Sequence, residues 1–288
     1  MPDSRTDCRP AFRSRSRVRP VVAVLAGLAT AALTATAGTA VGATTPDPNY
    51  GPPYHFTTEL MGQFGTPIPL KNMALLTTTD HGYLYRAGQQ NSHLTITMTD
   101  QGISFVDTGT ARWKSAVPAD CQQQKVAKGI AAVCRVPDGV TEAQPLLVEV
   151  WPRLGNDFVD GHTLPATVAM SVLADAGDDT AKLGAGPDFF NGHSGHDRVW
   201  GGDGNDWIRS GLDSDTVHAG GGNDKVVGQQ GADTIYGDDG DDALYGSGGG
   251  DQLYAGSGTD RASCGSGRDS ATIDGSDRAS KCEVVTRD

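Results

Sequence analysis

Residues 201–209 read Gly-Gly-Asp-Gly-Asn-Asp-Trp-Ile-Arg, and variants of this nine-residue unit return through the second half of the 288-residue chain. The unit has the form G-G-x-G-x-D-x-U-x, in which U is apolar. Its aspartate recurs every nine residues without a slip, at Asp179, Asp188, Asp197, Asp206, Asp215, Asp224, Asp233, Asp242, Asp251, Asp260 and Asp269. A short fixed period predicts a repeat architecture in which each unit packs on its neighbours.

The apolar position argues against a flexible linker or an acidic tail. Such segments share the Gly and Asp content but have no reason to place an apolar residue two positions after every aspartate. All eleven units do so, with Ala181, Phe190, Val199, Ile208, Val217, Val226, Ile235, Leu244, Leu253, Ala262 and Ala271. The x-U-x triplet predicts a short strand with one inward and two outward side chains, and the glycines permit a tight loop before it.

These units resemble the nonapeptide repeats of the RTX, or haemolysin-type, calcium-binding family, over about residues 174–272. The resemblance implies an all-β fold. It implies a right-handed parallel β-roll, similar to a β-helix, with two repeats and eighteen residues in each turn. It also implies that the roll binds several Ca²⁺ ions as cofactors.

Eighteen residues per turn would divide the aspartates into two stacked sets, and we expect both sets to bind calcium. The sets are Asp188, Asp206, Asp224, Asp242 and Asp260 on one edge, and Asp197, Asp215, Asp233, Asp251 and Asp269 on the other. Neighbouring carboxylates about 4.8 Å apart would repel one another by an amount on the order of 1 kcal/mol per pair. Ca²⁺ would remove this repulsion because it takes roughly six to eight oxygen ligands, whereas Mg²⁺ prefers a compact octahedron and keeps its waters.

Some units depart from the pattern. Asp213 replaces the last glycine in the unit of Asp215, and the unit of Asp179 lacks the leading glycine pair, so Asp179 is left out of the expected ligands. We expect Asp224 to matter more for binding than Asp179, because only Asp224 lies between intact neighbours. The register is lost near the C-terminus, where Arg278 occupies the next aspartate position.

The cysteines test this register. Cys264 and Cys282 lie eighteen residues apart, one turn in the expected roll, which suits the Cα separation of roughly 4.4–6.8 Å that a disulfide needs. This pairing leaves Cys121 and Cys134 as a second disulfide. Free thiols are the alternative, but an exported chain should meet an oxidising environment.

Residues 1–43 have the pattern of a bacterial Sec-type signal peptide, with six arginines before an uncharged run from Val21 and small residues at Val41 and Ala43. An uncleaved membrane anchor is the alternative. The signal predicts a secreted, extracellular protein. We expect a Pro-rich leader at 44–54, an N-terminal β-rich cap at 55–145, the calcium-binding β-roll at 146–272 and a disulfide-linked C-terminal cap at 273–288.

Short alternating segments predict strands in the cap region, for example at Leu94, Ile96 and Met98. An off-register unit at 154–161 contains Asp157, which lies 22 residues before Asp179. We therefore expect the roll to begin near residue 146.

Charge narrows the choice of partners. The formal net charge is −12, and removal of residues 1–43, which carry six arginines and two aspartates, makes it −16. This balance argues against nucleic acid and against anionic membrane surfaces once the signal is cleaved, and it suits cations. We expect a monomer.

Enzyme signatures are weak. Asp107-Thr108-Gly109 follows an apolar run, as in an aspartic protease, but a protease needs two such carboxylates and the chain has one D-T-G. The motifs G-x-S-x-G and H-E-x-x-H are absent. His193 and His196 lie in one loop and could bind a transition metal, although exposed loop residues are the simpler reading.

Trp200, His218, Tyr236 and Tyr254 recur every eighteen residues, which predicts an outward-facing ladder of rings. Such rings could bind an extracellular polysaccharide or could stabilise the sheet as cross-strand pairs, and we favour the second reading. The sequence thus predicts a secreted, non-enzymatic protein stabilised by calcium. A surface- or polysaccharide-binding adhesin is the alternative, and a secreted hydrolase using the N-terminal region is a second one.

Overall fold

The computed structural model describes residues 70–88 and 91–288, and these contain strands and no helix. The expected signal peptide at 1–43, the leader at 44–54 and the start of the cap region lie outside the described residues. A search of the described residues finds no helix that is long and apolar enough to cross a membrane.

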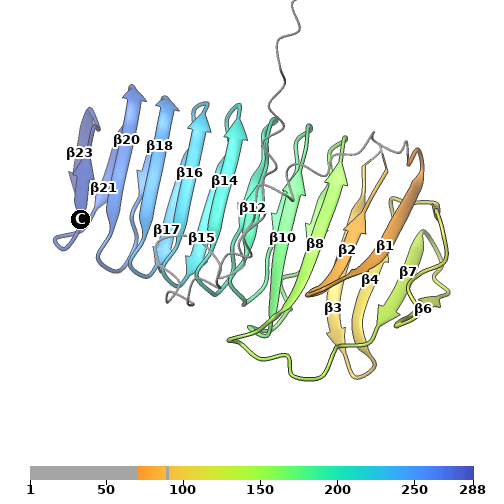
Figure 1. Cartoon of the computed structure of the whole chain (residues 1–288). Coiled ribbons are helices and arrows are strands. Elements are labelled where there is room, and N and C mark those ends of the chain that lie inside the picture. Colours follow the sequence, from red (N-terminus) through yellow and green to blue (C-terminus); the bar gives the residue numbers. More distant parts are fainter. Residues whose placement is uncertain (1–69, 89–90) are drawn as a thin grey trace, which may run out of the picture. The chain divides into compact units, whose positions relative to one another are not determined.

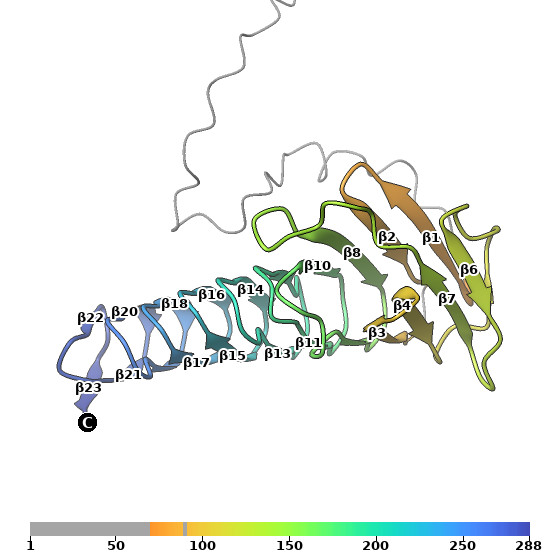
Figure 2. The ribbon, with the colours of Figure 1, turned by 90° about the horizontal axis from the view of Figure 1, so that it is seen from below.

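Two long sheets face each other, as Figures 1 and 2 show. The first sheet has eleven strands in the order β22 (Arg278–Ser280), β20 (Arg261–Gly267), β18 (Ala243–Gly249), β16 (Lys225–Gln230), β14 (Trp207–Leu212), β12 (Phe189–Asn191), β10 (Val168–Ala174), β8 (Leu146–Arg153), β2 (Gly82–Arg86), β1 (Met73–Thr79) and β5 (Arg112–Trp113). The second has twelve, in the order β23 (Val284–Arg287), β21 (Ser270–Ile273), β19 (Gln252–Tyr254), β17 (Thr234–Asp239), β15 (Thr216–Gly221), β13 (Arg198–Trp200), β11 (Thr180–Lys182), β9 (Phe158–Asp160), β3 (His93–Thr99), β4 (Gly102–Asp107), β7 (Ile130–Cys134) and β6 (Cys121–Gln124).

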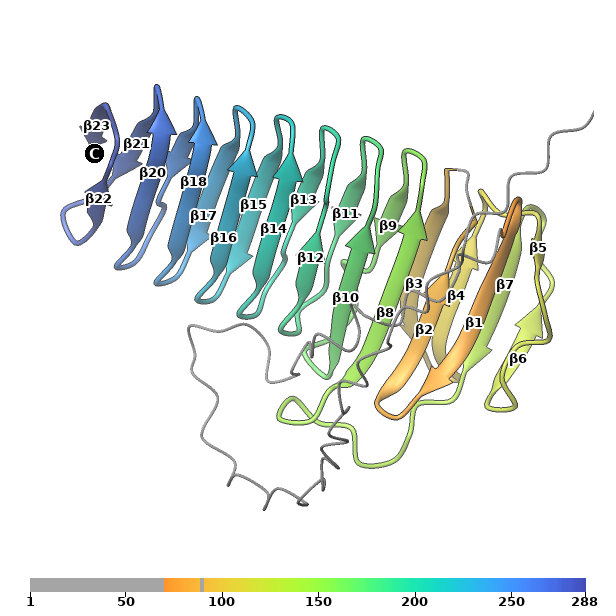
Figure 3. The ribbon, with the colours of Figure 1, turned by 45° about the horizontal axis from the view of Figure 1, so that its top comes forward.

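From β8 onward the chain alternates between the two sheets, and every pairing is parallel (Figure 3). Ile208 pairs with Val226, and Val217 pairs with Ile235, so one turn takes eighteen residues. This confirms the predicted all-β parallel roll and its period. The turn length changes at both ends: 22 residues separate paired positions of β9 and β11, 17 separate those of β20 and β22, and 14 separate those of β21 and β23.

The apolar U position fills the space between the sheets. Val199, Val217 and Ile235 in the second sheet, like Ile208 and Val226 in the first, are fully buried. A second inward position lies five residues before each aspartate, and small or apolar residues occupy it, among them Leu183, Ala219, Ala255 and Cys264. Burial of these two positions stabilises each turn against the next.

From Asp197 to Asp269, the residue four positions before each repeat aspartate has a left-handed conformation. At Gly202 the φ angle is 98°, and a Cβ atom there would lie 2.0 Å from the carbonyl oxygen of Gly184. Other residue types take the same conformation at this position, and Asp213 takes it at the last glycine position of the unit, two residues before Asp215, with φ 72°. The substitution at Asp213 therefore leaves the corner intact, and the strain is offset by packing in the rest of the turn.

The cap consists of strands β1 to β7, which pair mostly antiparallel and continue the two sheets of the roll. Strand β2 pairs with β8, and β3 pairs with β9. The strand predicted around Leu94, Ile96 and Met98 is β3. Both predicted disulfides are present, with Cα–Cα separations of 3.9 Å for Cys121–Cys134 and 5.0 Å for Cys264–Cys282.

Candidate metal-binding columns

The repeat aspartates lie at the corners, each directly before the first residue of a strand, and each is at most 3 % exposed. They form two columns. The first column contains Asp188, Asp206, Asp224, Asp242 and Asp260, and the second contains Asp157, Asp179, Asp197, Asp215, Asp233, Asp251 and Asp269.

Within a column, one hydrogen bond fixes the orientation of each carboxylate. The backbone N–H of Asp206 donates to Oδ1 of Asp224 at 2.7 Å, and that of Asp197 donates to Oδ1 of Asp215 at 2.8 Å. The same bond recurs along both columns at 2.7 to 3.0 Å. All the Oδ2 atoms are therefore held in equivalent places in successive turns.

The second oxygen of nearly every carboxylate is buried without a hydrogen-bond donor among the described residues. This applies to Oδ2 of Asp157, Asp179, Asp197, Asp206, Asp215, Asp224, Asp233, Asp242, Asp251, Asp260 and Asp269. Asp188, at the start of the first column, is the exception, because its Oδ2 accepts the N–H of Gly184 at 2.8 Å. Buried polar atoms are normally paired, so these oxygens need a partner that the described residues do not supply.

Burial and neighbouring carboxylates together disfavour ionisation of the columns. Burial, with a smaller contribution from nearby aspartates, raises the pKa of Asp197 and of Asp242 to about 8 and that of Asp233 to about 7. The single N–H donor lowers each pKa only in part. The pKa of Asp215 rises less, to about 6, and the hydroxyl of Ser210 is among the groups that hold it down.

Backbone oxygens approach the unpaired carboxylate oxygens where the repeat begins with glycine. A Cβ atom at Gly192 would lie 2.0 Å from Oδ2 of Asp197 and 2.2 Å from the carbonyl oxygen of Ser210 in the next turn. A Cβ atom at Gly246 would likewise meet Oδ2 of Asp251 and the carbonyl oxygen of Cys264. Glycine thus leaves a small space bordered by a carboxylate and a main-chain oxygen from adjacent turns.

The donor set fits a hard cation such as Ca²⁺. It consists of carboxylate and carbonyl oxygens, and these are the ligands that Ca²⁺ takes in flexible geometry. No three Asp, Glu, His or Cys side chains converge in the described part of the chain, so carbonyl oxygens of the loops would have to complete the coordination. Where bound, the ion would neutralise the columns and pair the buried Oδ2 atoms.

The roll is thus a parallel solenoid of nine-residue Gly- and Asp-containing units. Residues 173–271 match the family model for the RTX calcium-binding nonapeptide repeat, in overlapping segments at 173–208, 200–235, 209–244, 227–262 and 236–271. This segment therefore consists of RTX calcium-binding repeats, as the sequence predicted. No curated protein and no solved structure matches the chain.

Three column residues lie outside the set predicted from the period. Asp157 donates its N–H to Asp179, so Asp179 has a column neighbour on both sides, and its ranking below Asp224 stays a prediction. At the other end Asp277 accepts the N–H of Asp260, and Glu283 accepts that of Asp269. The nine-residue period could not predict these residues, because the turns that join Asp157, Asp277 and Glu283 to their neighbours contain 22, 17 and 14 residues.

The other candidate residues do not gather into a site. Asp107 of the D-T-G motif is 1 % exposed and accepts hydrogen bonds on both oxygens, so it is buried away from any substrate. His193 and His196 are exposed, and Nδ1 of His196 lies 2.9 Å from the carbonyl oxygen of Ser214.

The predicted aromatic ladder is present on the outer face of the second sheet. Ring centroids are 6.0 Å apart for Trp200 and His218, 4.3 Å for His218 and Tyr236, and 4.7 Å for Tyr236 and Tyr254, with planes within 10° of parallel. The ring faces therefore cover one another. This geometry favours the reading as cross-strand pairs, because a sugar would stack on an open face.

Proposed function

We propose that this protein is a secreted, non-enzymatic β-roll in which the two columns of aspartates bind calcium and thereby stabilise the fold outside the cell. The ligands are the ten predicted aspartates, Asp188, Asp197, Asp206, Asp215, Asp224, Asp233, Asp242, Asp251, Asp260 and Asp269, together with Asp179 and Asp157. The row of buried Oδ2 atoms without donors among the described residues, which all of these aspartates except Asp188 share, is the observation that carries this proposal.

Calcium supplies what these columns lack. Burial disfavours the ionised form of these carboxylates, and a calcium ion provides positive charge beside them. The carboxylate and carbonyl oxygens that border the glycines can coordinate the ion. Extracellular calcium-binding modules commonly work at roughly 10⁻⁴–10⁻³ M, which matches secretion through the signal predicted at 1–43. The described part of the chain would thus reach its full stability only outside the cell, where calcium is abundant.

The proposal makes the chain a binding protein rather than an enzyme. Asp107, the residue on which the hydrolase alternative depends, has hydrogen-bond donors on both oxygens. The polysaccharide-binding alternative stays a prediction, and a pull-down with insoluble polysaccharides would test it.

A calcium titration of the chelated protein, followed by circular dichroism, tests the proposal. We expect calcium to increase the β-sheet signal and the thermal stability. Asp233→Asn should raise the calcium concentration at the midpoint by about tenfold, because affinity depends on the number of charged ligands. The amide keeps an oxygen for the N–H of Asp215, so the fold is spared.

The matched control is Asp100→Asn, which removes one charge at an exposed turn between β3 and β4. Its midpoint should equal that of the wild type. A full β-sheet signal in chelator that calcium leaves unchanged, in signal and in melting temperature, would refute the proposal.

A further inference from the structure

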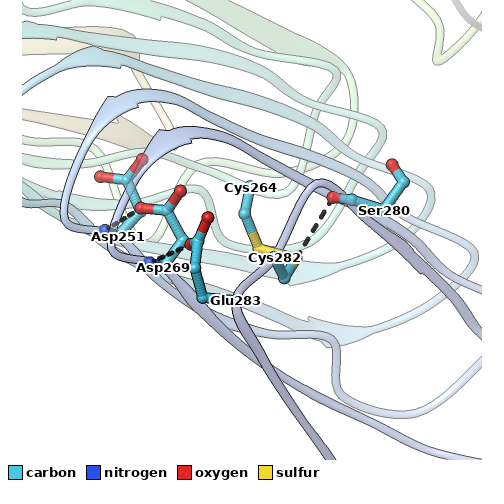
Figure 4. The surroundings of a disulfide bond; sticks show 6 residues. All are labelled: Asp251, Cys264, Asp269, Ser280, Cys282 and Glu283. Atoms are coloured by element: carbon cyan, nitrogen blue, oxygen red, sulfur yellow. Dashed lines mark hydrogen bonds between the residues drawn. A yellow bond between two sulfur atoms is a disulfide. The ribbon is translucent and has the colours of Figure 1, made fainter.

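The second column ends on a glutamate rather than an aspartate. The eighteen-residue period would place its next member at position 287, which is Arg287. Instead Oε2 of Glu283 accepts the N–H of Asp269 at 2.7 Å, in the same way that Oδ1 of Asp269 accepts the N–H of Asp251 at 2.8 Å. Figure 4 shows the three carboxyl groups in a row.

The Cys264–Cys282 disulfide lies at the short corner from which Glu283 joins this row. Cys264 is fully buried five residues before Asp269, and Cys282 directly precedes Glu283 (Figure 4). The N–H of Gly265 also donates to the carbonyl oxygen of Lys281 at 3.2 Å. The last turn is therefore tied to the previous corner at the residue before Glu283, which limits where its carboxylate can lie.

In the last pair of the second column, Asp269 keeps the feature that marks the interior aspartates, whereas Glu283 is exposed. Asp269 is 1 % exposed, and its Oδ2 has no donor within the described chain. The first column ends differently, because Asp277 accepts the N–H of Asp260 on one oxygen and the N–H of Asp274 on the other. Oδ2 of the preceding aspartate, Asp260 or Asp269, has no donor among the described residues in either column. The two ends differ in their last residue, because Asp277 has donors on both oxygens, whereas within the described chain only Oε2 of Glu283 accepts a hydrogen bond.

We propose that Asp269 and Glu283 form a terminal calcium site beyond the nine-residue register, in which the Cys264–Cys282 disulfide positions Glu283. The proposal rests on calcium binding by the columns. Asp269 contributes the buried carboxylate oxygen. Glu283 contributes the second negative charge, which the nine-residue register no longer supplies at this end, and loop carbonyl oxygens complete the set of ligands. Glu283 lies outside the segment that matches the repeat family, so the site belongs to this chain's own C-terminal end.

Equilibrium dialysis of the whole protein against calcium tests the site by counting bound ions. Glu283→Gln should bind one ion fewer than the wild type, or bind its weakest ion at least tenfold more weakly. Glutamine retains an oxygen for the N–H of Asp269, so only the charge is lost. The matched control is Asp288→Asn, which removes one charge from the exposed C-terminus and should bind as the wild type does.

The disulfide is tested by Cys264→Ala combined with Cys282→Ala; alanine already occupies the equivalent position to Cys264 at Ala219 and Ala255. This variant should lose the same ion, and adding Glu283→Gln should cause no further loss. An additive second loss would refute the positioning role. If the wild type binds calcium and Glu283→Gln binds it equally, the terminal site is refuted, whereas a wild type without calcium would refute the proposed function itself.

Discussion

The cap and the roll both bury aspartates, but they satisfy the carboxylate oxygens differently. Asp107 in the cap has five donors within the chain: three hydroxyl groups donate to Oδ2 and two backbone N–H groups to Oδ1, from Tyr85, Ser92, Thr110, His93 and Gly109. Asp233 in the roll accepts one N–H on Oδ1, and its Oδ2 has no donor in the described residues.

The pKa values of the two residues move in opposite directions. Burial raises the pKa of Asp107, but the hydrogen bonds, led by those from Thr110 and Tyr85, outweigh it and leave the pKa below its ordinary value. Burial raises the pKa of Asp233 to about 7, and its single N–H donor cannot compensate. An unpaired oxygen, rather than burial alone, therefore marks the carboxylates that need a cation.

The largest expected effect is the pH dependence of the metal-free roll. The folded-state pKa values of Asp197 and Asp242, about 8, exceed the ordinary value of 3.8, so protonation favours the folded state. The contribution of these protonated aspartates to the free energy of unfolding is complete below about pH 4 and is lost as the pH rises through the folded-state pKa. We expect the melting temperature in chelator to fall between about pH 5 and about pH 8.

Calcium should weaken or reverse this dependence, because it binds the ionised carboxylates. Asp107 has the opposite sign, since its contribution to folding stability is present above its ordinary pKa of 3.8 and is lost as the pH falls through its lowered pKa. Differential scanning calorimetry at several pH values, in chelator and in calcium, measures both effects. A melting temperature in chelator that rises toward about pH 8 would contradict the assignment of the roll aspartates as uncompensated.

A smaller effect, on the free energy of unfolding, should distinguish Asp107 from Asp233 directly. In chelator, Asp107→Asn should destabilise the protein by about 1–3 kcal/mol, because buried donors lose their ionised acceptor. Asp233→Asn should leave stability in chelator unchanged or raise it, because it removes a buried charge without a partner. Urea unfolding measures both free energies. Equal destabilisation by the two substitutions would remove the distinction between cap and roll.

The sequence predicted the roll well because each turn repeats the same physical requirements. An apolar residue must fill the interior, as Ile208 does, and a left-handed corner must avoid the carbonyl of the previous turn, as Gly202 does. The period also predicted the aromatic ladder and the Cys264–Cys282 pair. Because the turns repeat regularly, the nine-residue sequence pattern was enough to predict which residues of successive turns lie side by side.

The ends of the columns could not be predicted, because there the turns change length and the period no longer applies. Asp277 is displaced by one residue from the expected position, and Glu283, four residues before its expected position, lies next to the Cys264–Cys282 disulfide. In the cap, the role of Asp107 depends on Tyr85 and Ser92, which lie 22 and 15 residues away and share no pattern with it.

The smallest expected effect tests whether the outer face of the roll is independent of its columns. Tyr236 stacks between His218 and Tyr254, so Tyr236→Ala should cost about 0.5–2 kcal/mol for two cross-strand pairs. The control is Tyr245→Ala on the outer face of the first sheet, where Tyr245 is 38 % exposed and, among the described residues, makes no ring contact. Because the stack contacts no column carboxylate, its cost should be the same in calcium and in chelator by urea unfolding. If Tyr236→Ala destabilised the protein only in calcium, the calcium-bound columns would order the outer surface of the sheet. The columns would then affect residues outside the corners that hold their carboxylates.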